Sequence, residues 1–275
     1  MKDPDPRKLL PWFGSNTKLA PVVGKMFGRL RWCGVPFLGG GSELKFLDAK
    51  TGVANDLHSQ VINLFNVVRD PEQREALIQQ MISRVYHVEE FRSAQARCKN
   101  MEFKFADAVE SAADYFVSAW MGRKGQAGTK NEFNNSFAFR WTCEGGDPVK
   151  EYHNARNALR YWSSVFQPWA FTCMDALRFI DWVKDHPDHG LYIDAPWPGA
   201  GDAYTHQYTE NHQYALAAAL TTFEETKIVV RFGDTPFIRK LYPEGLWKWN
   251  MHESRTQGNQ KLPEALLTNF DWSPE

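Results

Sequence analysis

The chain has 275 residues, of which 43% are hydrophobic and 24% are charged. This composition is typical of a folded globular protein and excludes a disordered chain, a collagen or a coiled coil as the main architecture. No apolar run approaches the roughly 18 residues of a membrane-spanning helix, so no membrane partner is expected. The formal net charge of −1 gives no overall sign of nucleic-acid binding, although one basic face would be enough for it.

The cysteines are far apart in the sequence and form no Cys-x-x-Cys pair; they are Cys33, Cys98, Cys143 and Cys173. This distribution favours free thiols in a reducing cytoplasm over a disulfide framework or a zinc site. Residues 1–6 lack the apolar core of a signal peptide. We therefore expect a cytoplasmic protein without a bound metal.

The first part of the chain is predicted to alternate between strands and helices. Its helices are indicated by apolar residues at helical spacing, and Pro71 is typical of the first position of a helix. In chain order we expect an apolar strand end at 35–38, a short helix at 42–47, a strand at 52–56, and helices at 59–69 and 71–85.

The middle of the chain, from about residue 86 to 165, is less regular. It contains helical patches at 105–120 and 151–165 and a glycine-rich basic loop at 121–130. The end is expected to contain strands at 191–194, 227–232, 246–252 and 265–270, a helix at 209–223, and a helix capped by Thr235-Pro236. Strands that alternate with helices at both ends indicate an α/β sheet, with the middle as an insertion.

A glycine-rich turn follows the first predicted strand, with the sequence Pro36-Phe37-Leu38-Gly39-Gly40-Gly41-Ser42-Glu43. Glycines let a ligand approach the backbone, and the N-terminus of the next helix offers free N–H groups. Asp56, at the end of the next strand, could accept hydrogen bonds from ribose hydroxyls. The spacing is not G-x-G-x-x-G and no phosphate-binding G-x-x-x-x-G-K is present, which disfavours dinucleotides and nucleoside triphosphates. A tight turn with a helix cap would give the same pattern.

A second motif, Tyr192-Ile193-Asp194-Ala195-Pro196-Trp197, stands at the carboxyl end of a predicted strand, where ligands of open α/β sheets bind. An acid and a backbone carbonyl can both accept hydrogen bonds from one amino group, and an indole can stack on a ring. This set suits a flat heterocycle that carries an exocyclic amine. An acid-capped turn with a core tryptophan is the alternative interpretation.

Further segments stand in a regular order around these two motifs. They are Trp12-Phe13-Gly14-Ser15-Asn16-Thr17-Lys18, Asn55-Asp56-Leu57 with the helix that follows to Phe65-Asn66, Tyr204-Thr205-His206, Phe232-Gly233-Asp234 and Thr268-Asn269-Phe270. With the glycine-rich motif first and the Asp194 motif last, the chain resembles the Dam-type, alpha-class DNA adenine-N6 methyltransferases.

The resemblance implies a fold and a division into domains. The fold is the α/β, Rossmann-like sheet of S-adenosylmethionine-dependent methyltransferases, mostly parallel with an antiparallel strand near the C-terminus, with an inserted, mainly helical target-recognition lobe. Residues 1–69 and 170–275 would form the catalytic, cofactor-binding domain, and residues 70–169 the DNA-binding insertion.

The resemblance also implies the cofactor, S-adenosyl-L-methionine. Asp56 would bind its ribose and Asp175 its adenine, although Asp175 precedes an apolar helix and a helix cap is the alternative role. The family's Gly-Lys pair is replaced by Ser15-Asn16, so Lys18 would supply the missing cation or be solvated. The residues expected at this site are Trp12, Phe13, Gly14, Lys18, Pro36, Phe37, Gly39, Gly40, Gly41, Ser42, Asp56, Leu57 and Asp175.

The segment Asp194-Ala195-Pro196-Trp197 corresponds to the family's catalytic Asp-Pro-Pro-Tyr. Asp194 and the Ala195 carbonyl would accept hydrogen bonds from the N6 amine of an adenine flipped out of the duplex, and Trp197 would stack on its ring. Ala195 lacks the rigidity that proline confers, whereas Trp197 stacks at least as well as tyrosine. This mechanism requires no metal.

The glycine-rich loop is the best candidate for DNA contact, because four basic residues between 121 and 141 accompany a single acid, Glu132. Lysines would hold phosphates, arginines could read guanine edges, and asparagines could read adenine. The residues are Arg123, Lys124, Lys130, Asn131, Asn134, Asn135 and Arg140, together with Arg255 in a second polar loop at 253–259. A solvated loop is the alternative interpretation.

The expected function is thus site-specific methylation of adenine N6 in duplex DNA by a monomer of bacterial, phage or mobile-element origin, with a restriction endonuclease as a further partner to consider. Two alternatives stay open from the sequence. The acceptor could be another amine, such as cytosine N4 or an RNA adenine. The chain could also be a non-catalytic DNA-binding protein on this fold, which the departures at Ser15-Asn16 and Ala195 would favour.

Overall fold

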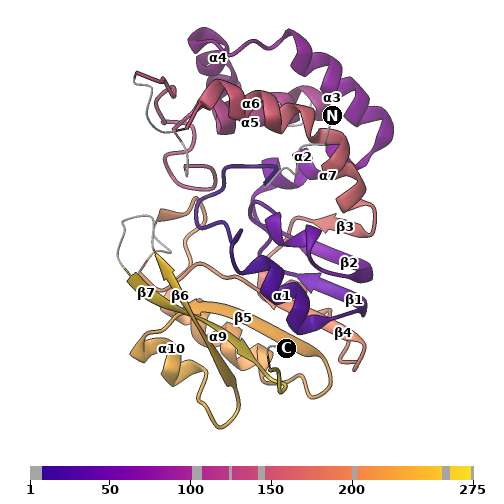
Figure 1. The fold of residues 1–275 in the computed structure, drawn as a ribbon, viewed down its shortest axis with the longest axis vertical. Coiled ribbons are helices and arrows are strands. Elements are labelled where there is room, and N and C mark those ends of the chain that lie inside the picture. The colour runs from indigo at the N-terminus through magenta and orange to yellow at the C-terminus, as the bar shows by residue number, and fades with distance from the viewer. Residues whose placement is uncertain are drawn as a thin grey trace. The chain divides into compact units, whose positions relative to one another are not determined.

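The protein is represented by a computed structural model that describes residues 8–100, 107–123, 126–141, 146–199, 203–255 and 261–273. By internal packing the chain forms two units (Figure 1). The helical unit comprises Met1–Thr17, Gly39–Lys45 and His58–Gln167. The sheet unit comprises Lys18–Leu38, Phe46–Leu57 and Pro168–Glu275.

The described strands of the sheet unit form one seven-stranded sheet of order β3-β2-β1-β4-β5-β7-β6. They are β1 (Leu30–Val35), β2 (Ala49–Asn55), β3 (Trp169–Thr172), β4 (His189–Ile193), β5 (Lys227–Gly233), β6 (Lys248–Arg255) and β7 (Lys261–Thr268). The strands β1 to β5 run parallel to one another, and β7 runs antiparallel to its neighbours β5 and β6. The predicted α/β fold, mostly parallel with an antiparallel strand near the C-terminus, is confirmed. The order reverses next to β1, where the carboxyl ends of such strands border a ligand site.

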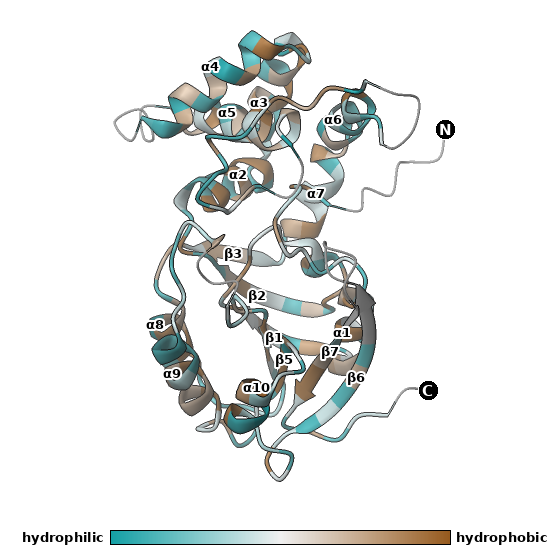
Figure 2. Ribbon diagram, turned by 90° about the vertical axis from the view of Figure 1, so that its left-hand side faces the viewer, coloured by the Kyte–Doolittle hydropathy of each residue, from teal (hydrophilic) through white to brown (hydrophobic). Residues whose placement is uncertain are grey.

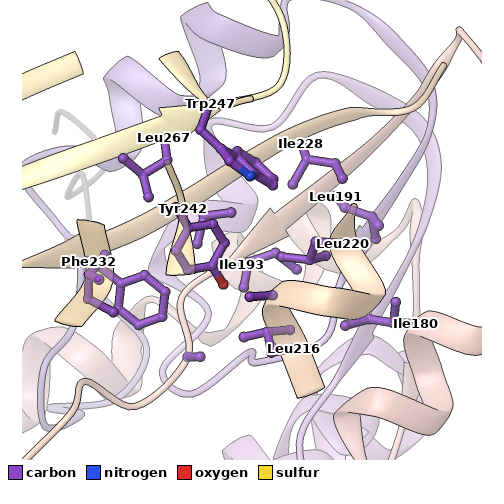
Figure 3. Packing of buried hydrophobic residues seen from close by; sticks show 14 of the residues in the cluster. Ile180, Leu191, Ile193, Leu216, Leu220, Ile228, Phe232, Tyr242, Trp247 and Leu267 are labelled. Atoms are coloured by element: carbon purple, nitrogen blue, oxygen red, sulfur yellow. The ribbon is translucent and has the colours of Figure 1, made fainter. Parts of the chain in front are cut away.

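Helices cover both faces of this sheet. They are α1 (Ala20–Phe27), α8 (Ala176–Asp181), α9 (Glu210–Leu220) and α10 (Pro236–Leu241). Figure 2 shows α8, α9 and α10 on one side of the strands and α1 on the other. Beneath α8, α9 and α10 lies a buried apolar cluster, in which Tyr242, Trp247 and Phe232 gather with Ile193 and Leu216 (Figure 3).

Alternation along the strands decides which residues face this cluster. Val230 and Phe232 on β5 point into it, so Arg231 between them points to the opposite face of the sheet. Ile193 on β4 likewise points into the cluster, which turns Tyr192 and the following Asp194 toward the same face as Arg231. The strand pattern therefore places Tyr192, Asp194 and Arg231 on the same face of the sheet.

The helical unit contains α2 (Ser59–Arg69), α3 (Pro71–Ser83), α4 (Val88–Lys99), α5 (Ala108–Met121), α6 (Pro148–Asn157), α7 (Leu159–Phe166) and a 3-10 turn, η1 (Ser42–Lys45). Its central helix, α5, is almost entirely buried. Asp114 on α5 is 3% exposed and receives two hydrogen bonds of 2.7 Å from Arg97 on α4, with Arg84 as a further ion-pair partner. The pair with Arg97 ties α4 to α5, and the pair with Arg84 ties the end of α3 to α5.

The helices expected at 59–69 and after Thr235 are confirmed at their predicted starts. The helix α4 was not expected, because its buried face is made of Phe91, Ala94, Gln95 and Cys98 and carries one large hydrophobic residue. The strand β3 was also missed, since four residues are too few to show alternation. The short helix expected at 42–47 is a single 3-10 turn.

Within the described residues, none of the helices is long and apolar enough to span a bilayer. By packing, residues 1–17, 39–45 and 58–69 belong to the helical unit, whereas the prediction placed them in the domain made of 1–69 and 170–275. That predicted division follows function rather than packing, and it remains a prediction.

Candidate active site

The segment Asp194-Ala195-Pro196-Trp197 follows directly on β4, at its carboxyl end. Ala195 is 1% exposed and packs with the apolar cluster, while Asp194 and Trp197 are partly buried. The buried alanine anchors the segment and leaves the two functional side chains at the edge of the sheet.

Asp194 is held by hydrogen bonds from two strands. The Tyr192 hydroxyl donates to Oδ2 at 3.2 Å, and Arg231 Nη1 on β5 lies 3.2 Å from Oδ1 and 3.0 Å from Oδ2. Burial raises the pKa of Asp194, and the Arg231 cation and the Tyr192 hydroxyl oppose that rise. The carboxylate is therefore desolvated but tied to a cation.

Arg231 is itself paired a second time. Its Nε and Nη2 both lie 3.0 Å from Oε2 of Glu264 on β7. Burial alone would lower the pKa of Arg231, but Asp194, Tyr192 and Glu264 together raise it. The sequence prediction missed both Arg231 and Glu264. A signal was available for Arg231, which is a basic residue in a predicted strand between the apolar residues Val230 and Phe232.

The rest of the segment is also fixed from outside. Gln213 on α9 donates from Nε2 to the Pro196 carbonyl at 2.6 Å. The Arg231 guanidinium lies 5.3 Å from the centre of the Trp197 ring. A Cβ atom on Gly233 would lie 2.9 Å from the same ring, so the last residue of β5 has to be small. Trp197 is thus packed against the end of β5.

Asn55, at the end of β2, joins three strand ends and was not predicted as a site residue. Its side chain donates to the Pro36 carbonyl at 3.1 Å and accepts from Thr172 Oγ1 at 2.9 Å and from the Met174 N–H at 3.0 Å. Its carbonyl accepts from Leu38 N–H at 2.9 Å. Asn55 is fully buried, so it fixes the backbone on either side of the predicted cofactor residues.

Of the predicted cofactor residues of the sheet unit, Pro36 contacts Asn55, and Phe37, Asp56 and Leu57 follow these two in the chain. Asp56 and Phe37 are partly buried, and Leu57 is 46% exposed. Asp175 accepts hydrogen bonds from Leu177 N–H at 2.9 Å and Arg178 N–H at 3.1 Å, so its Oδ1 caps α8. Lys18 is exposed.

In the helical unit the glycine turn is packed against Trp12. A Cβ atom at Gly39 or Gly40 would lie within 2.7 Å of Trp12, and one at Gly128 within 2.4 Å. Gly39 has φ +51° and Gly41 has φ +63°, a region that favours glycine. The close approach that Gly39 permits is that of the Trp12 indole ring, and the one that Gly40 permits is that of the Trp12 Cβ atom. Ser42 is linked to Ser15 by a hydrogen bond of 3.0 Å between their hydroxyls.

The N-terminal motif runs beside the glycine-rich loop. Phe13 N–H donates to the Ala127 carbonyl at 3.1 Å. Phe13 is partly buried, whereas Gly14 is exposed. The two glycine-rich segments that the sequence singled out therefore meet through the N-terminal motif, which no sequence pattern indicated.

A buried acid organises the glycine-rich loop. Glu132 is 5% exposed and accepts hydrogen bonds from His58 Nε2 at 2.6 Å, Gly128 N–H at 2.8 Å and Tyr115 at 3.4 Å. The single acid of this basic stretch is therefore an internal brace, which counters the interpretation of the whole loop as a solvated segment.

Most predicted DNA-contact residues in the described part of this loop lie on its surface. Arg123, Lys130, Asn131, Asn134 and Arg140 are exposed, and Arg140 also pairs with Asp147 at 3.2 Å. Their surface position is compatible with contact to DNA.

Three other predicted DNA contacts differ from this pattern. Asn135 is partly buried and donates from Nδ2 to the Arg123 carbonyl at 2.9 Å. Arg255 ends the strand β6, so the expected polar loop at 253–259 is wrong for its first three residues. Strand pairing of β6 with β7 extends further than the apolar pattern indicated. Lys124 lies outside the described residues.

Within the described ranges, no three His, Cys, Asp or Glu side chains gather as a metal site would require. The groups described around the segment 194–197 are carboxylates, an arginine, backbone carbonyls and an indole. This set can bind an amine-bearing planar ring and hold it against a second ligand.

Comparison with known proteins gives one family. Residues 12–258 match the D12 class N6 adenine-specific DNA methyltransferases. The DNA adenine methylase of Haemophilus influenzae is 23% identical over 251 residues, which cover 86% of this chain and 82% of that protein. The Type II methyltransferase M1.LlaDCHI of Lactococcus lactis subsp. cremoris is 24% identical over 287 residues, covering 96% and 95%. The chain therefore belongs to the family of D12 class N6 adenine-specific DNA methyltransferases, enzymes that use a methyl donor to methylate adenine in DNA.

Proposed function

We propose that the chain transfers a methyl group from S-adenosyl-L-methionine to the N6 amine of an adenine flipped out of duplex DNA, with Asp194 as the catalytic acceptor. One observation carries this proposal. A desolvated carboxylate and an indole ring stand at the carboxyl end of β4, in a segment, Asp-Ala-Pro-Trp, that resembles the family's catalytic Asp-Pro-Pro-Tyr. This edge of the sheet is where ligands of such folds bind.

The amine is a poor nucleophile because its lone pair is delocalised into the adenine ring. The Asp194 carboxylate and the Ala195 carbonyl each accept a hydrogen bond from one N–H of the amine. These two hydrogen bonds favour a pyramidal nitrogen with a directed lone pair. Trp197 stacks on the base, and this stacking contributes about 1–3 kcal/mol. That gain roughly offsets the few kcal/mol that flipping the base costs.

The residues at the ends of β1 and β2 fit the proposed cofactor. Asp56, partly buried after β2, supplies a carboxylate for two ribose hydroxyls, and Phe37 supplies an apolar face for a planar base. Asn55 precedes Asp56 and donates hydrogen bonds to the Pro36 and Met174 carbonyls, so it fixes the backbone next to Phe37 and Asp56. S-adenosylmethionine, when bound, supplies a methyl group on a sulfonium leaving group. The other proposed contacts to it are Trp12, Phe13, Gly14, Lys18, Pro36, Gly39, Gly40, Gly41, Ser42, Leu57 and Asp175.

The proposed DNA contacts are the exposed cations and amides of the helical unit. Arg123, Lys130 and Arg140 supply positive charge, and Asn131 and Asn134 supply amides that can read base edges. Lys124, Asn135 and Arg255 stay in the proposed set. This assignment supports a target-recognition role for residues 70–169, with 1–69 and 170–275 as the catalytic domain.

We further infer a cytoplasmic enzyme that acts on DNA as a monomer. The relative named a Type II methyltransferase supports a pairing with a restriction endonuclease that shares the recognition sequence. Co-expression with such an endonuclease tests this pairing: protection of host DNA is the expected result, and unprotected DNA contradicts it.

Asp194→Ala is the direct test of the catalytic assignment. We expect the purified variant to bind S-adenosylmethionine with near-normal Kd and to transfer no detectable labelled methyl group to DNA, because the amine loses its charged acceptor. Both readouts come from the same preparation, by isothermal titration and by scintillation counting. Turnover close to that of the wild type would remove Asp194 from the mechanism.

A further inference from the structure

Arg231 lies within β5 with 8% of its surface exposed. Its guanidinium donates to both oxygens of Asp194, at 3.2 and 3.0 Å, and lies 5.3 Å from the centre of the Trp197 ring. On its other edge it pairs with Glu264 at 3.0 Å. One planar cation therefore contacts both the first and the last residue of the segment 194–197.

This arrangement is not explained by packing. Burying a cation and two carboxylates costs solvation free energy, and an apolar side chain of similar size would fill the space that Arg231 occupies without that cost. What the guanidinium adds is geometry, because its donors point in fixed directions within one plane. Residue 231 therefore determines the placement of its partners.

The segment 194–197 depends on such outside restraint. Ala195 leaves the backbone torsion φ less restricted than a proline would. The Pro196 carbonyl is held by Gln213 at 2.6 Å, which fixes the backbone but neither functional side chain. Arg231 is the group in the described structure that contacts both of these side chains.

We propose that Arg231, oriented by Glu264, is a positioning residue for methyl transfer that sets the Asp194 carboxylate and the Trp197 ring in the relative placement required by the target adenine. The inference rests on the proposed roles of Asp194 and Trp197. Arg231 and Tyr192 together make three described hydrogen bonds to the Asp194 carboxylate. A carboxylate has about four acceptor positions, so one is left for the amine.

Glu264 has a second effect, through charge. Asp194 and Arg231 alone would be neutral, and the Glu264 carboxylate gives the group of three a net charge of −1. The amine nitrogen becomes positively charged as the bond from sulfur to the methyl group breaks and the nitrogen–methyl bond forms, and it returns to neutral when one N–H proton is released to water. A net negative surrounding stabilises the positive charge in between. Glu264 therefore orients Arg231 and offsets its charge.

Arg231→Lys tests the proposal, because an ammonium group cannot reproduce the planar fork. We expect the single-turnover rate of methyl transfer to fall by about 10- to 100-fold, with the Kd for DNA and for S-adenosylmethionine within about threefold of wild type. Glu264→Gln keeps an acceptor oxygen and should give a smaller fall.

Arg239→Lys is the matched control. Arg239 also pairs with two carboxylates, Asp234 at 2.7 Å and Glu244 at 2.7 Å, and lies 4.5 Å from the centre of the Trp249 ring. It touches no residue of the segment 194–197 in the described contacts. We expect Arg239→Lys to leave the single-turnover rate unchanged.

A spectroscopic readout separates this inference from the proposed function. With 5-fluorotryptophan incorporated, and the Trp197 signal assigned through Trp197→Phe, Arg231→Lys should move the 19F resonance of Trp197. Arg239→Lys should move that of Trp249 instead. These shifts report ring placement whether or not the enzyme turns over.

The outcomes are then distinct. A slower rate with a displaced Trp197 resonance supports the proposal. A wild-type rate in Arg231→Lys overturns it, as does a slower rate that follows weaker ligand binding alone. If Arg231→Lys does not fold, Glu264→Gln decides in the same way. If the wild-type protein transfers no methyl group, the proposed function is refuted. The catalytic role of Arg231 is then refuted as well, even if Arg231→Lys moves the 19F resonance of Trp197.

Discussion

At the scale of single residues, close packing around the segment 194–197 leaves little room for larger side chains. Gly233 is the clearest case, because a Cβ atom there would meet the Trp197 ring at 2.9 Å. Contacts below 3.0 Å force a neighbour to move, and the neighbour is the proposed stacking surface. A methyl group at this position therefore changes the geometry of the site directly.

Gly233→Ala should lower the single-turnover rate of methyl transfer by about tenfold, because the displaced indole no longer faces the base correctly. Rapid-quench measurement with labelled S-adenosylmethionine checks this. Gly245→Ala is the control, since no atom lies within 4 Å of the Cβ that it would add. Equal rates for the two variants would show that the placement of Trp197 has no kinetic role.

At the scale of elements, a carboxylate that accepts several hydrogen bonds fixes a loop or turn in each unit. Glu132 braces the glycine-rich loop by accepting hydrogen bonds from His58, Gly128 and Tyr115. Asp185 accepts the N–H groups of Glu224 and Thr226 and so ties the turn before β5 to the segment before β4. Both acids have structural roles that their neighbours in sequence do not indicate.

Glu132→Ala should lower the free energy of unfolding by about 3 kcal/mol, because three buried donors lose their acceptor. Chemical denaturation followed by circular dichroism measures this. Glu72→Ala, on the exposed first turn of α3, should change stability by less than about 0.5 kcal/mol. A Glu132→Ala variant as stable as the Glu72→Ala control would mean that the loop is not braced.

The pKa of Asp185 predicts how the stability of the protein changes at acidic pH. Burial alone would raise its pKa, but hydrogen bonds from the N–H groups of Glu224, Thr226 and Glu225 lower it from 3.8 to about 2. The ionised group thus stabilises the fold above pH 3.8, and this contribution is lost as the pH falls through about 2. Asp185→Asn should have a lower Tm than wild type at pH 7, with the two converging near pH 2. A difference in Tm that is constant across this range would contradict the assignment.

At the scale of the whole molecule, the sheet could be predicted because repeated strand and helix patterns at both ends of the chain agree with one another. The place of Asp194 at the carboxyl end of a strand could be predicted because the apolar run of that strand ends directly before it. Helix α4 escaped because its buried face is largely polar or small. Asn55 and Arg231 escaped because their partners lie on other strands, and pairing across a sheet is not visible in the sequence.

The two units also differ in what they contribute. The sheet unit carries Asp194, Arg231 and Trp197, and the helical unit carries the exposed cations around the glycine-rich loop. Net charge concealed this division, because the acids of the chain balance its bases overall. The distribution of charge, rather than its sum, is what fits a DNA substrate.

Nucleoside mass spectrometry tests the central claim most directly. DNA is taken from a methylation-deficient host that expresses either the wild-type chain or Asp194→Ala. We predict N6-methyladenine in the first sample and none in the second. N4-methylcytosine in the first sample would contradict the assigned acceptor, and equal N6-methyladenine in both would contradict the assigned catalytic residue. Unmodified DNA in both, with folded protein present, would contradict catalysis itself.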